Sequence, residues 1–226
     1  AAVLFSGGAD SMAAAVYYLS EGYAVRLLTY DNGAERNFEN SRKSAGVIKK
    51  RFPGKASWAL GESGALFKKT GIVNIAGDIK EYGDSLICCS CKLAMLAEAV
   101  IYCVKNNIKI IADGFNKNQL YYPEQLPEYI DITGILAARY GVKYEHPIYG
   151  LSRAKRDALL RSAEIRTAPS QASCLFAFNR VRNERVGEYT LSKMPMAVRY
   201  INKKLAEGKS VIKTRVRKKA KRRLGV

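Results

Sequence analysis

The stretch Ala1-Ala-Val-Leu-Phe-Ser6-Gly-Gly-Ala-Asp10-Ser11 decides the fold class of this chain. The apolar run from Ala1 to Phe5 predicts a buried strand, and residues 11–19 have the apolar spacing of a helix. The glycines between them let the backbone turn tightly, and successive amide hydrogens at the start of a helix can hold phosphate oxygens. A strand, a glycine turn and a helix in this order therefore predict a phosphate-binding loop.

The polar side chains of this loop have distinct expected roles. The hydroxyl groups of Ser6 and Ser11 can donate to phosphate oxygens, and Gly7 and Gly8 let the backbone approach them. Asp10 repels a phosphate, so we expect it to bind the Mg²⁺ that accompanies the phosphates. The alternative is a strand-to-helix turn that is merely rich in glycine. The order of strand, turn, acidic residue and helix disfavours that alternative.

Apolar strands alternate with helical segments along most of the chain. Further strands are expected at residues 24–30, 56–60, 71–75 and 108–112, and helices at 37–52, 93–105, 129–140, 152–162 and 194–205. This alternation predicts an α/β fold, a Rossmann-like parallel sheet with helices on both faces. Ligands of such sheets bind at the carboxyl ends of the strands, so the loops after Phe5, Tyr30 and Ala112 should line one site.

The charge of the chain favours a polyanionic partner. Lys and Arg outnumber Asp and Glu by 38 to 20, a net charge of +18, and residues 209–226 form a basic run. RNA is the simplest partner for such a surplus, although a basic protein without that partner is the alternative. We expect residues 179–226 to be a basic helical extension and tail. No apolar run near 20 residues and no signal-peptide layout is evident, so we expect a cytoplasmic protein without membrane contact.

The loop at residues 6–11 carries a family resemblance. Ser6-Gly7-Gly8-Ala9-Asp10-Ser11 matches the SGGxDS signature of the N-type PP-loop ATP pyrophosphatases, which have the adenine-nucleotide α-hydrolase-like fold. The resemblance covers residues 1–178 and implies cleavage of ATP to AMP and pyrophosphate, with an adenylated substrate as intermediate. In that family the end of the second strand and a later loop hold the adenosine. The residues at the matching places are Tyr30, Asp31, Asp113, Gly114 and Asn116. Turn chemistry is the alternative explanation for both segments.

The five cysteines do not form a disulfide framework. Their number is odd, and Cys88, Cys89 and Cys91 lie within four positions. Cys88 and Cys91 have the i, i+3 spacing of a metal clip, and the helix expected to begin near residue 93 would favour the thiolate form. Cys174 would be a third ligand that leaves a fourth position open, whereas Cys103 in an apolar helix is expected in the core.

Two cysteine segments resemble the tRNA 2-thiouridylases of the same family. They are Cys88-x-x-Cys91-Lys92 and Ser170-Gln-Ala-Ser-Cys174-Leu-Phe176. The resemblance implies a sulfurtransferase that adenylates a nucleobase in tRNA and replaces oxygen with sulfur. In several members three such cysteines hold a [4Fe-4S] cluster, and in others two act as persulfide and partner; zinc or no role are further alternatives. The CxxC spacing selects Cys88 over Cys89 as the ligand. The sulfur donor stays open, and a homodimer is compatible with this interpretation.

A third resemblance favours a different substrate. Residues 119–129 resemble the substrate loop of the 7-cyano-7-deazaguanine synthases, and residues 22–31 are close to theirs. Those enzymes carry a C-terminal zinc knot of several cysteines, which cannot be built here because only Cys174 follows Cys103. A small-molecule synthase and a non-catalytic RNA-binding module are therefore the alternatives, and Asp10 argues against the module. The aromatic group Tyr121, Tyr122 and Tyr129 is compatible with base stacking or with a helix edge, and we expect His146 to be structural.

Overall fold

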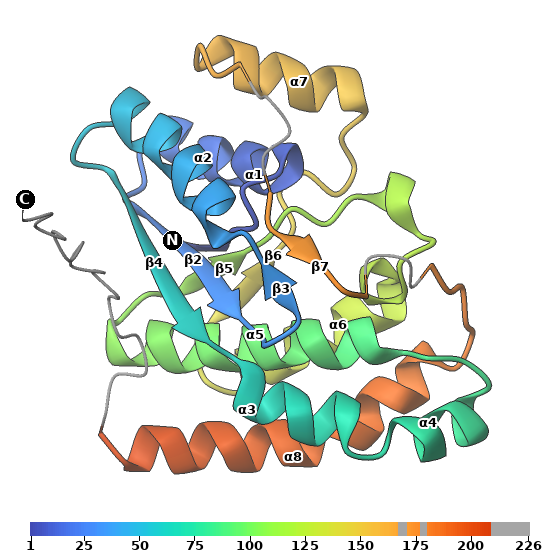
Figure 1. Ribbon diagram of the computed structural model, residues 1–226. Coiled ribbons are helices and arrows are strands. Elements are labelled where there is room, and N and C mark those ends of the chain that lie inside the picture. The colour runs from blue at the N-terminus through green and yellow to red at the C-terminus, as the bar shows by residue number, and fades with distance from the viewer. Residues whose placement is uncertain (167–170, 177–179, 209–226) are drawn as a thin grey trace, which may run out of the picture.

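The computed structural model describes residues 1–166, 171–176 and 180–208 (Figure 1). Its main sheet has five parallel strands in the order β4-β2-β1-β5-β6. These strands are β1 (Ala2–Leu4), β2 (Val25–Asp31), β4 (Ala56–Glu62), β5 (Ile110–Ala112) and β6 (Lys143–Glu145). A separate antiparallel pair joins β3 (Glu35–Arg36) to β7 (Ser173–Cys174). The Rossmann-like parallel sheet predicted from the alternation of strands and helices is confirmed.

Helices cover both faces of the sheet (Figure 1). On one face lie α1 (Ala9–Ser20), α2 (Phe38–Arg51) and α7 (Arg153–Ser162). On the other face lie α3 (Gly64–Phe67), α4 (Ile75–Tyr82), α5 (Ile87–Lys105), α6 (Pro127–Ala138) and α8 (Val186–Ala206). Three short turns complete the described elements: a π-helix η1 (Lys68–Ile72) and the 3₁₀ turns η2 (Lys117–Gln119) and η3 (Pro123–Gln125).

The two apolar layers explain why the strands contain few polar residues. Val3 and Phe5 pack with α1 and α2, whereas Leu4 and Leu28 pack with α5 on the other face. Successive side chains of a strand point to opposite faces, so a sheet that is covered twice needs apolar residues at every position. The same layers hold Cys103, which is completely buried beside Ile111, as the sequence predicted.

The predicted strand at residues 71–75 is wrong. This stretch contains the end of the π-helix η1 and the start of α4. Gly71 packs so closely on α5 that an added Cβ would lie 2.9 Å from the Cβ of Ser90. Ile72 and Ile75 of this short run pack against the core while Val73 is exposed, and an apolar run of that length does not distinguish a strand from a helical turn.

Helix α8 packs on the same core as the sheet. It runs from Val186 to Ala206, longer than the predicted 194–205, and buries Ala197 and Ile201 against α5. By its length and composition, helix α5 could span a membrane, although the sequence analysis found no apolar run near 20 residues. The helix is mostly buried, however, as the central helix of this core. The division of the chain at residue 178 stays a prediction, and the basic run 209–226 lies outside the described residues.

Candidate active site

The loops predicted to line one site do meet at the carboxyl edge of the sheet. β1, β2 and β5 are neighbours and run parallel, so the segments after Phe5, Asp31 and Ala112 emerge side by side. Residues that are far apart in sequence can contact one another there, because parallel strands deliver all of their carboxyl ends to one edge.

The phosphate loop satisfies its own amides through its serines. The Gly7 amide donates to Ser11 Oγ over 3.2 Å, and the Gly8 amide donates to Ser6 Oγ over 3.3 Å. Ser41 on α2 anchors the loop by donating to the Ser6 carbonyl oxygen over 2.5 Å. Gly8 is the N-cap of α1 and has no side chain with which to cap the first turn. The amides at this helix end are therefore suited to an anion.

Asp10 is held by side chains from two distant segments. Arg156 Nη1 lies 2.5 Å from Asp10 Oδ1, and Gln119 Nε2 donates to Asp10 Oδ2 over 3.1 Å. Gln125 Nε2 donates in turn to Gln119 Oε1 over 3.0 Å. The carboxylate of the phosphate loop is thus fixed from both sides, and the sequence contained no signal that Arg156 or Gln119 would reach it.

The loop after β5 is pressed against the first turn of α1. A Cβ added at Gly114 would lie 2.5 Å from the Ser11 nitrogen, so only glycine fits. Asp113 is 3% exposed, and both of its carboxylate oxygens contact other residues of the protein. It accepts hydrogen bonds from the Tyr144 hydroxyl and from the Phe115 amide, and its Oδ1 lies 2.8 Å from His146 Nδ1. Asp113 therefore shapes this loop, and the backbone at Gly114 remains the part that can contact a nucleotide.

The loop after β2 offers backbone rather than the aromatic ring to a ligand. The Tyr30 side chain is buried in the core, where burial raises the pKa of its hydroxyl well above the ordinary value. Asp31 Oδ1 accepts the Gly33 amide over 2.8 Å, which builds the turn, and Gly33 has a φ of +86° that favours glycine. Asn32 Nδ2 donates to Cys91 Sγ over 3.0 Å. This turn therefore connects the carboxyl edge of the sheet, where the nucleotide is expected, to the cysteine segment.

The CxxC segment lies within α5, not before it. Because α5 begins at Ile87, six residues earlier than predicted, Cys91 is in its second turn. Burial raises the pKa of the Cys91 thiol, which opposes the stabilisation of a thiolate that was expected from the helix end. Cys88 and Cys91 are partly exposed, whereas Cys89 is buried. The choice of Cys88 over Cys89 as a ligand stays a prediction.

The segment carrying Cys174 lies over the phosphate loop. Cys174 pairs with Glu35 between β3 and β7, and Asn40 Nδ2 on α2 donates to the Gln171 carbonyl oxygen over 3.2 Å. A Cβ on Gly8 would collide with Gln171 Oε1. Glu35 follows the turn that holds Cys91, since its amide donates to Asn32 Oδ1. The two cysteine segments therefore meet on one side of the site. Ser170 lies outside the described residues.

The family match covers the same part of the chain. Residues 1–177 match the protein family described as queuosine biosynthesis protein QueC. This protein belongs to the QueC family. With its intact phosphate loop it is an ATP-dependent, nucleobase-modifying enzyme of the PP-loop pyrophosphatase type. No curated protein matches the chain.

Solved structures resemble the chain in fold. A 4-thiouridine synthetase in complex with RNA and bound ATP is 16% identical with a TM-score of 0.58, over 91% of this chain and 53% of that protein. A predicted subunit of tRNA methyltransferase from Methanocaldococcus jannaschii is 19% identical with a TM-score of 0.46, over 71% and 74%. The U34-tRNA thiolase NcsA from Methanococcus maripaludis, with its [4Fe-4S] cluster, is 16% identical with a TM-score of 0.46, over 91% and 71%. The likeness to the 4-thiouridine synthetase, at 16% identity, shows the fold alone.

A half-buried cation with two acidic neighbours is the feature of this QueC-family site that sequence analysis missed. Burial alone would lower the pKa of Lys92, but the nearby Cys91, Glu35 and Glu124 raise it. Burial raises the pKa of both carboxyl groups, and Lys92 opposes that rise. Glu124 Oε2 is buried without a hydrogen-bond partner among the described residues. The group Lys92, Glu35 and Glu124 can thus present one positive charge and two acceptors to a polar ligand.

The aromatic residues considered for base stacking differ in their exposure. Tyr129 is buried and donates to the Cys89 carbonyl oxygen, so it cannot stack a base, whereas Tyr121 is 43% exposed. His146 stacks on Phe115 with an interplanar angle of 7°. Its Nδ1 contacts Asp113, and its Nε2 is buried without a partner in the described part of the chain. The pairing of a lone histidine with a distant aspartate could not be found from sequence spacing.

The three cysteines do not fit a metal cluster in this arrangement. In residues 1–166, 171–176 and 180–208, no three His, Cys, Asp or Glu side chains are close enough together to hold a metal ion. Cys91 instead accepts from Asn32, and Cys174 Sγ accepts from the Phe176 amide over 3.4 Å.

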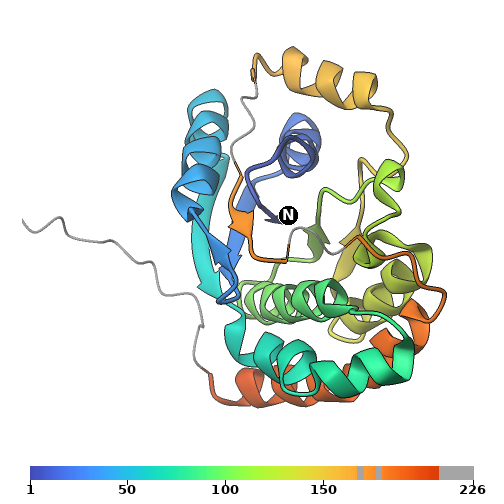
Figure 2. The same cartoon turned by 45° about the vertical axis from the view of Figure 1, so that its right-hand side comes forward.

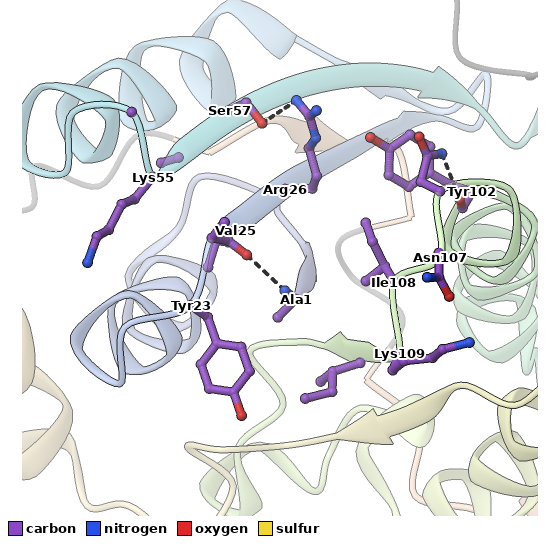
Figure 3. A pocket seen from close by; sticks show the side chains of 15 residues that line it. Ala1, Tyr23, Val25, Arg26, Lys55, Ser57, Tyr102, Asn107, Ile108 and Lys109 are labelled. Atoms are coloured by element: carbon purple, nitrogen blue, oxygen red, sulfur yellow. Dashed lines mark hydrogen bonds between the residues drawn. The ribbon is translucent and has the colours of Figure 1, made fainter.

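One cavity lies away from this site, at the opposite edge of the sheet. It has a volume of about 610 Å³ and is lined at the amino ends of β2, β4 and β5 (Figure 3). Arg26, Lys55 and Lys109 give it a basic lining, and Arg26 donates to Ser57 over 2.5 Å. Parallel sheets bind their ligands at the carboxyl edge, so the position of this cavity separates it from the ATP chemistry.

Proposed function

We propose that this enzyme forms the nitrile of a 7-cyano-7-deazaguanine from the carboxylic acid at the same oxidation level, with ATP and ammonia. Membership of the QueC family supports the substrate class. The observation that carries the proposal is the group Lys92, Glu35 and Glu124, whose charges lie close enough to oppose the effect of burial on one another, with Glu124 Oε2 left without a hydrogen-bond partner among the described residues. Lys92 suits the substrate carboxylate, and the unpartnered Glu124 Oε2 suits an N–H of a guanine-like edge.

The proposed chemistry has two adenylation steps. The substrate carboxylate oxygen attacks the α-phosphorus of ATP, and pyrophosphate leaves with the electron pair of the broken P–O bond. Ammonia then attacks the adenylated carbon, and AMP and a proton leave to give the amide. A second ATP activates the amide oxygen in the same way, and loss of AMP and of both amide protons gives the nitrile. The chain's tasks are to hold the phosphates at Gly7 and Gly8, to hold MgATP through Asp10, and to orient the acid through Lys92.

A reaction assay tests this proposal directly. The protein is incubated with MgATP, 7-carboxy-7-deazaguanine and ammonium, and AMP, pyrophosphate and the nitrile are measured by mass spectrometry. Nitrile formation with one AMP for each of the two steps is expected. Lys92→Met should remove most of it, whereas Lys80→Met, at an exposed position on α4, should not. No nitrile and no amide from the wild-type protein would reject the proposal.

Thiolation of a tRNA base is a second candidate because the two cysteine segments meet beside the phosphate loop. The bond from Asn32 to Cys91 and the pairing of Cys174 with Glu35 favour it. Under this candidate Cys174→Ser abolishes product formation from tRNA and a sulfide donor. Under the nitrile synthase, Cys174→Ser keeps its activity. Iron analysis of anaerobically purified protein tests the cluster form of this candidate, which requires four irons per chain that are lost in Cys88→Ala, Cys91→Ala or Cys174→Ala but not in Cys103→Ala.

A further inference from the structure

Arg156 connects a peripheral helix to the aspartate of the phosphate loop. It lies on α7, and only 12% of its side chain is exposed. Its Nη1 is 2.5 Å from Asp10 Oδ1, while its Nε and Nη2 lie 3.1 and 2.9 Å from Asp157 Oδ1. Asp157 thus orients the guanidinium group toward Asp10. Among the described residues, the other side chain that donates to Asp10 is Gln119.

The ion pair is not needed to attach α7 to the fold. Leu160 on α7 and the following Ala163 and Ile165 are buried in the core beneath α1. Figure 2 shows the gold α7 lying beyond the dark blue α1, to which this apolar contact joins it. A partly buried ion pair contributes little net stability compared with apolar packing, since both charges lose hydration. The position of Arg156 therefore calls for an explanation other than docking.

We propose that Arg156 is a catalytic residue whose guanidinium group leaves Asp10 and binds the pyrophosphate moiety of ATP. The Mg²⁺ that arrives with ATP and the guanidinium of Arg156 compete for the same carboxylate oxygen. With Asp10 engaged by the metal, the guanidinium of Arg156 would be free to bind an anion at the start of α1. This inference rests on the role of Asp10 in the proposed function, but it does not depend on which base is the substrate.

The released guanidinium stabilises the charge that forms as the α–β phosphate bond breaks. Its planar fork matches two phosphate oxygens at once, and it keeps its proton throughout, so it acts by charge and hydrogen bonding alone. The electron pair of the broken bond stays on the pyrophosphate, where charge increases most in the transition state. The pair with Asp157 keeps the side chain in reach of that position.

Removing the guanidinium should change two binding properties in opposite directions. In Arg156→Gln, Asp10 loses its competitor, so the Mg²⁺ concentration that half-saturates ATP binding should fall about two- to fivefold, as expected for a partly exposed ion pair. Binding of inorganic pyrophosphate should weaken about tenfold or more, because a hydrogen bond to a charged group is lost. A purely structural role would weaken both together. Arg156→Lys should restore part of the pyrophosphate affinity.

The experiment is calorimetric titration of the full chain with ATP at a series of Mg²⁺ concentrations, and separately with inorganic pyrophosphate. Arg153→Gln is the control, because Arg153 lies on the same helix, is 86% exposed and forms its ion pair with Asp157. Wild-type Mg²⁺ dependence or wild-type pyrophosphate affinity in Arg156→Gln would overturn this inference and leave the proposed function standing. Wild-type Mg²⁺ dependence in Asp10→Asn would overturn both.

Discussion

Substitution of Gly114 by alanine tests how closely the loop after β5 must approach the phosphate loop. The new Cβ would lie 2.5 Å from the Ser11 nitrogen and 2.6 Å from the Asp10 carbonyl carbon, whereas ordinary contacts begin near 3.4 Å. Both are backbone atoms of α1 and cannot rotate away. The loop and the helix must therefore separate by about 1 Å, a displacement that can cost on the order of 100-fold in a positioned reaction.

The expected effects follow from that separation. Overpacking of this kind costs about 1–3 kcal/mol. For a chain of this size each kcal/mol lowers Tm by about 2–4 °C. Thermal unfolding followed by circular dichroism and the rate of pyrophosphate release measure the two consequences. Gly46→Ala is the control, because Gly46 lies within α2 with no neighbouring atom within 4 Å, and it should gain up to about 1 kcal/mol. A Gly114→Ala variant with wild-type Tm and pyrophosphate release would refute the reasoning.

Three further predictions concern the loop, the core and the tail. Asp10→Asn should keep the fold and nearly abolish pyrophosphate release; normal turnover would remove the PP-loop mechanism from consideration. Burial raises the pKa of Glu98 to about 6, although Tyr200 and Lys204 partly offset this rise. The folded state therefore binds the proton of this carboxyl group more tightly than the unfolded state does. The stability that Glu98 contributes is consequently lost as the pH rises from 4.5 through 6. The advantage of Glu98→Gln in urea unfolding should therefore grow over that interval by up to about 2 kcal/mol, and a constant difference would contradict it. Deletion of residues 209–226 should leave ATP binding unchanged but weaken tRNA binding and flatten its dependence on salt, which a titration at several salt concentrations measures against the full chain.

The sequence by itself determined the features whose signals are local. The strand, glycine turn and helix around Ser6 to Ser11 lie within about twenty residues, so spacing and residue type were enough to predict them. The alternation of apolar segments likewise predicted the parallel sheet, and the position of Cys103 in an apolar helix predicted its burial. Each of these inferences needs only periodicity and the known geometry of a strand or helix.

Tertiary structure alone decided which distant side chains complete the site. Arg156 and Asp10 are 146 positions apart, and Gln119 and Asp10 are 109 apart, so no repeat or spacing links them. The same holds for Glu35 and Glu124, whose burial around Lys92 depends on how β3, η3 and α5 pack. The strand wrongly predicted at residues 71–75 and the late start predicted for α5 have a related cause. Contact with a neighbouring helix, rather than local propensity, sets the structure of both segments, because the free energy of burying apolar surface exceeds the small differences in intrinsic preference.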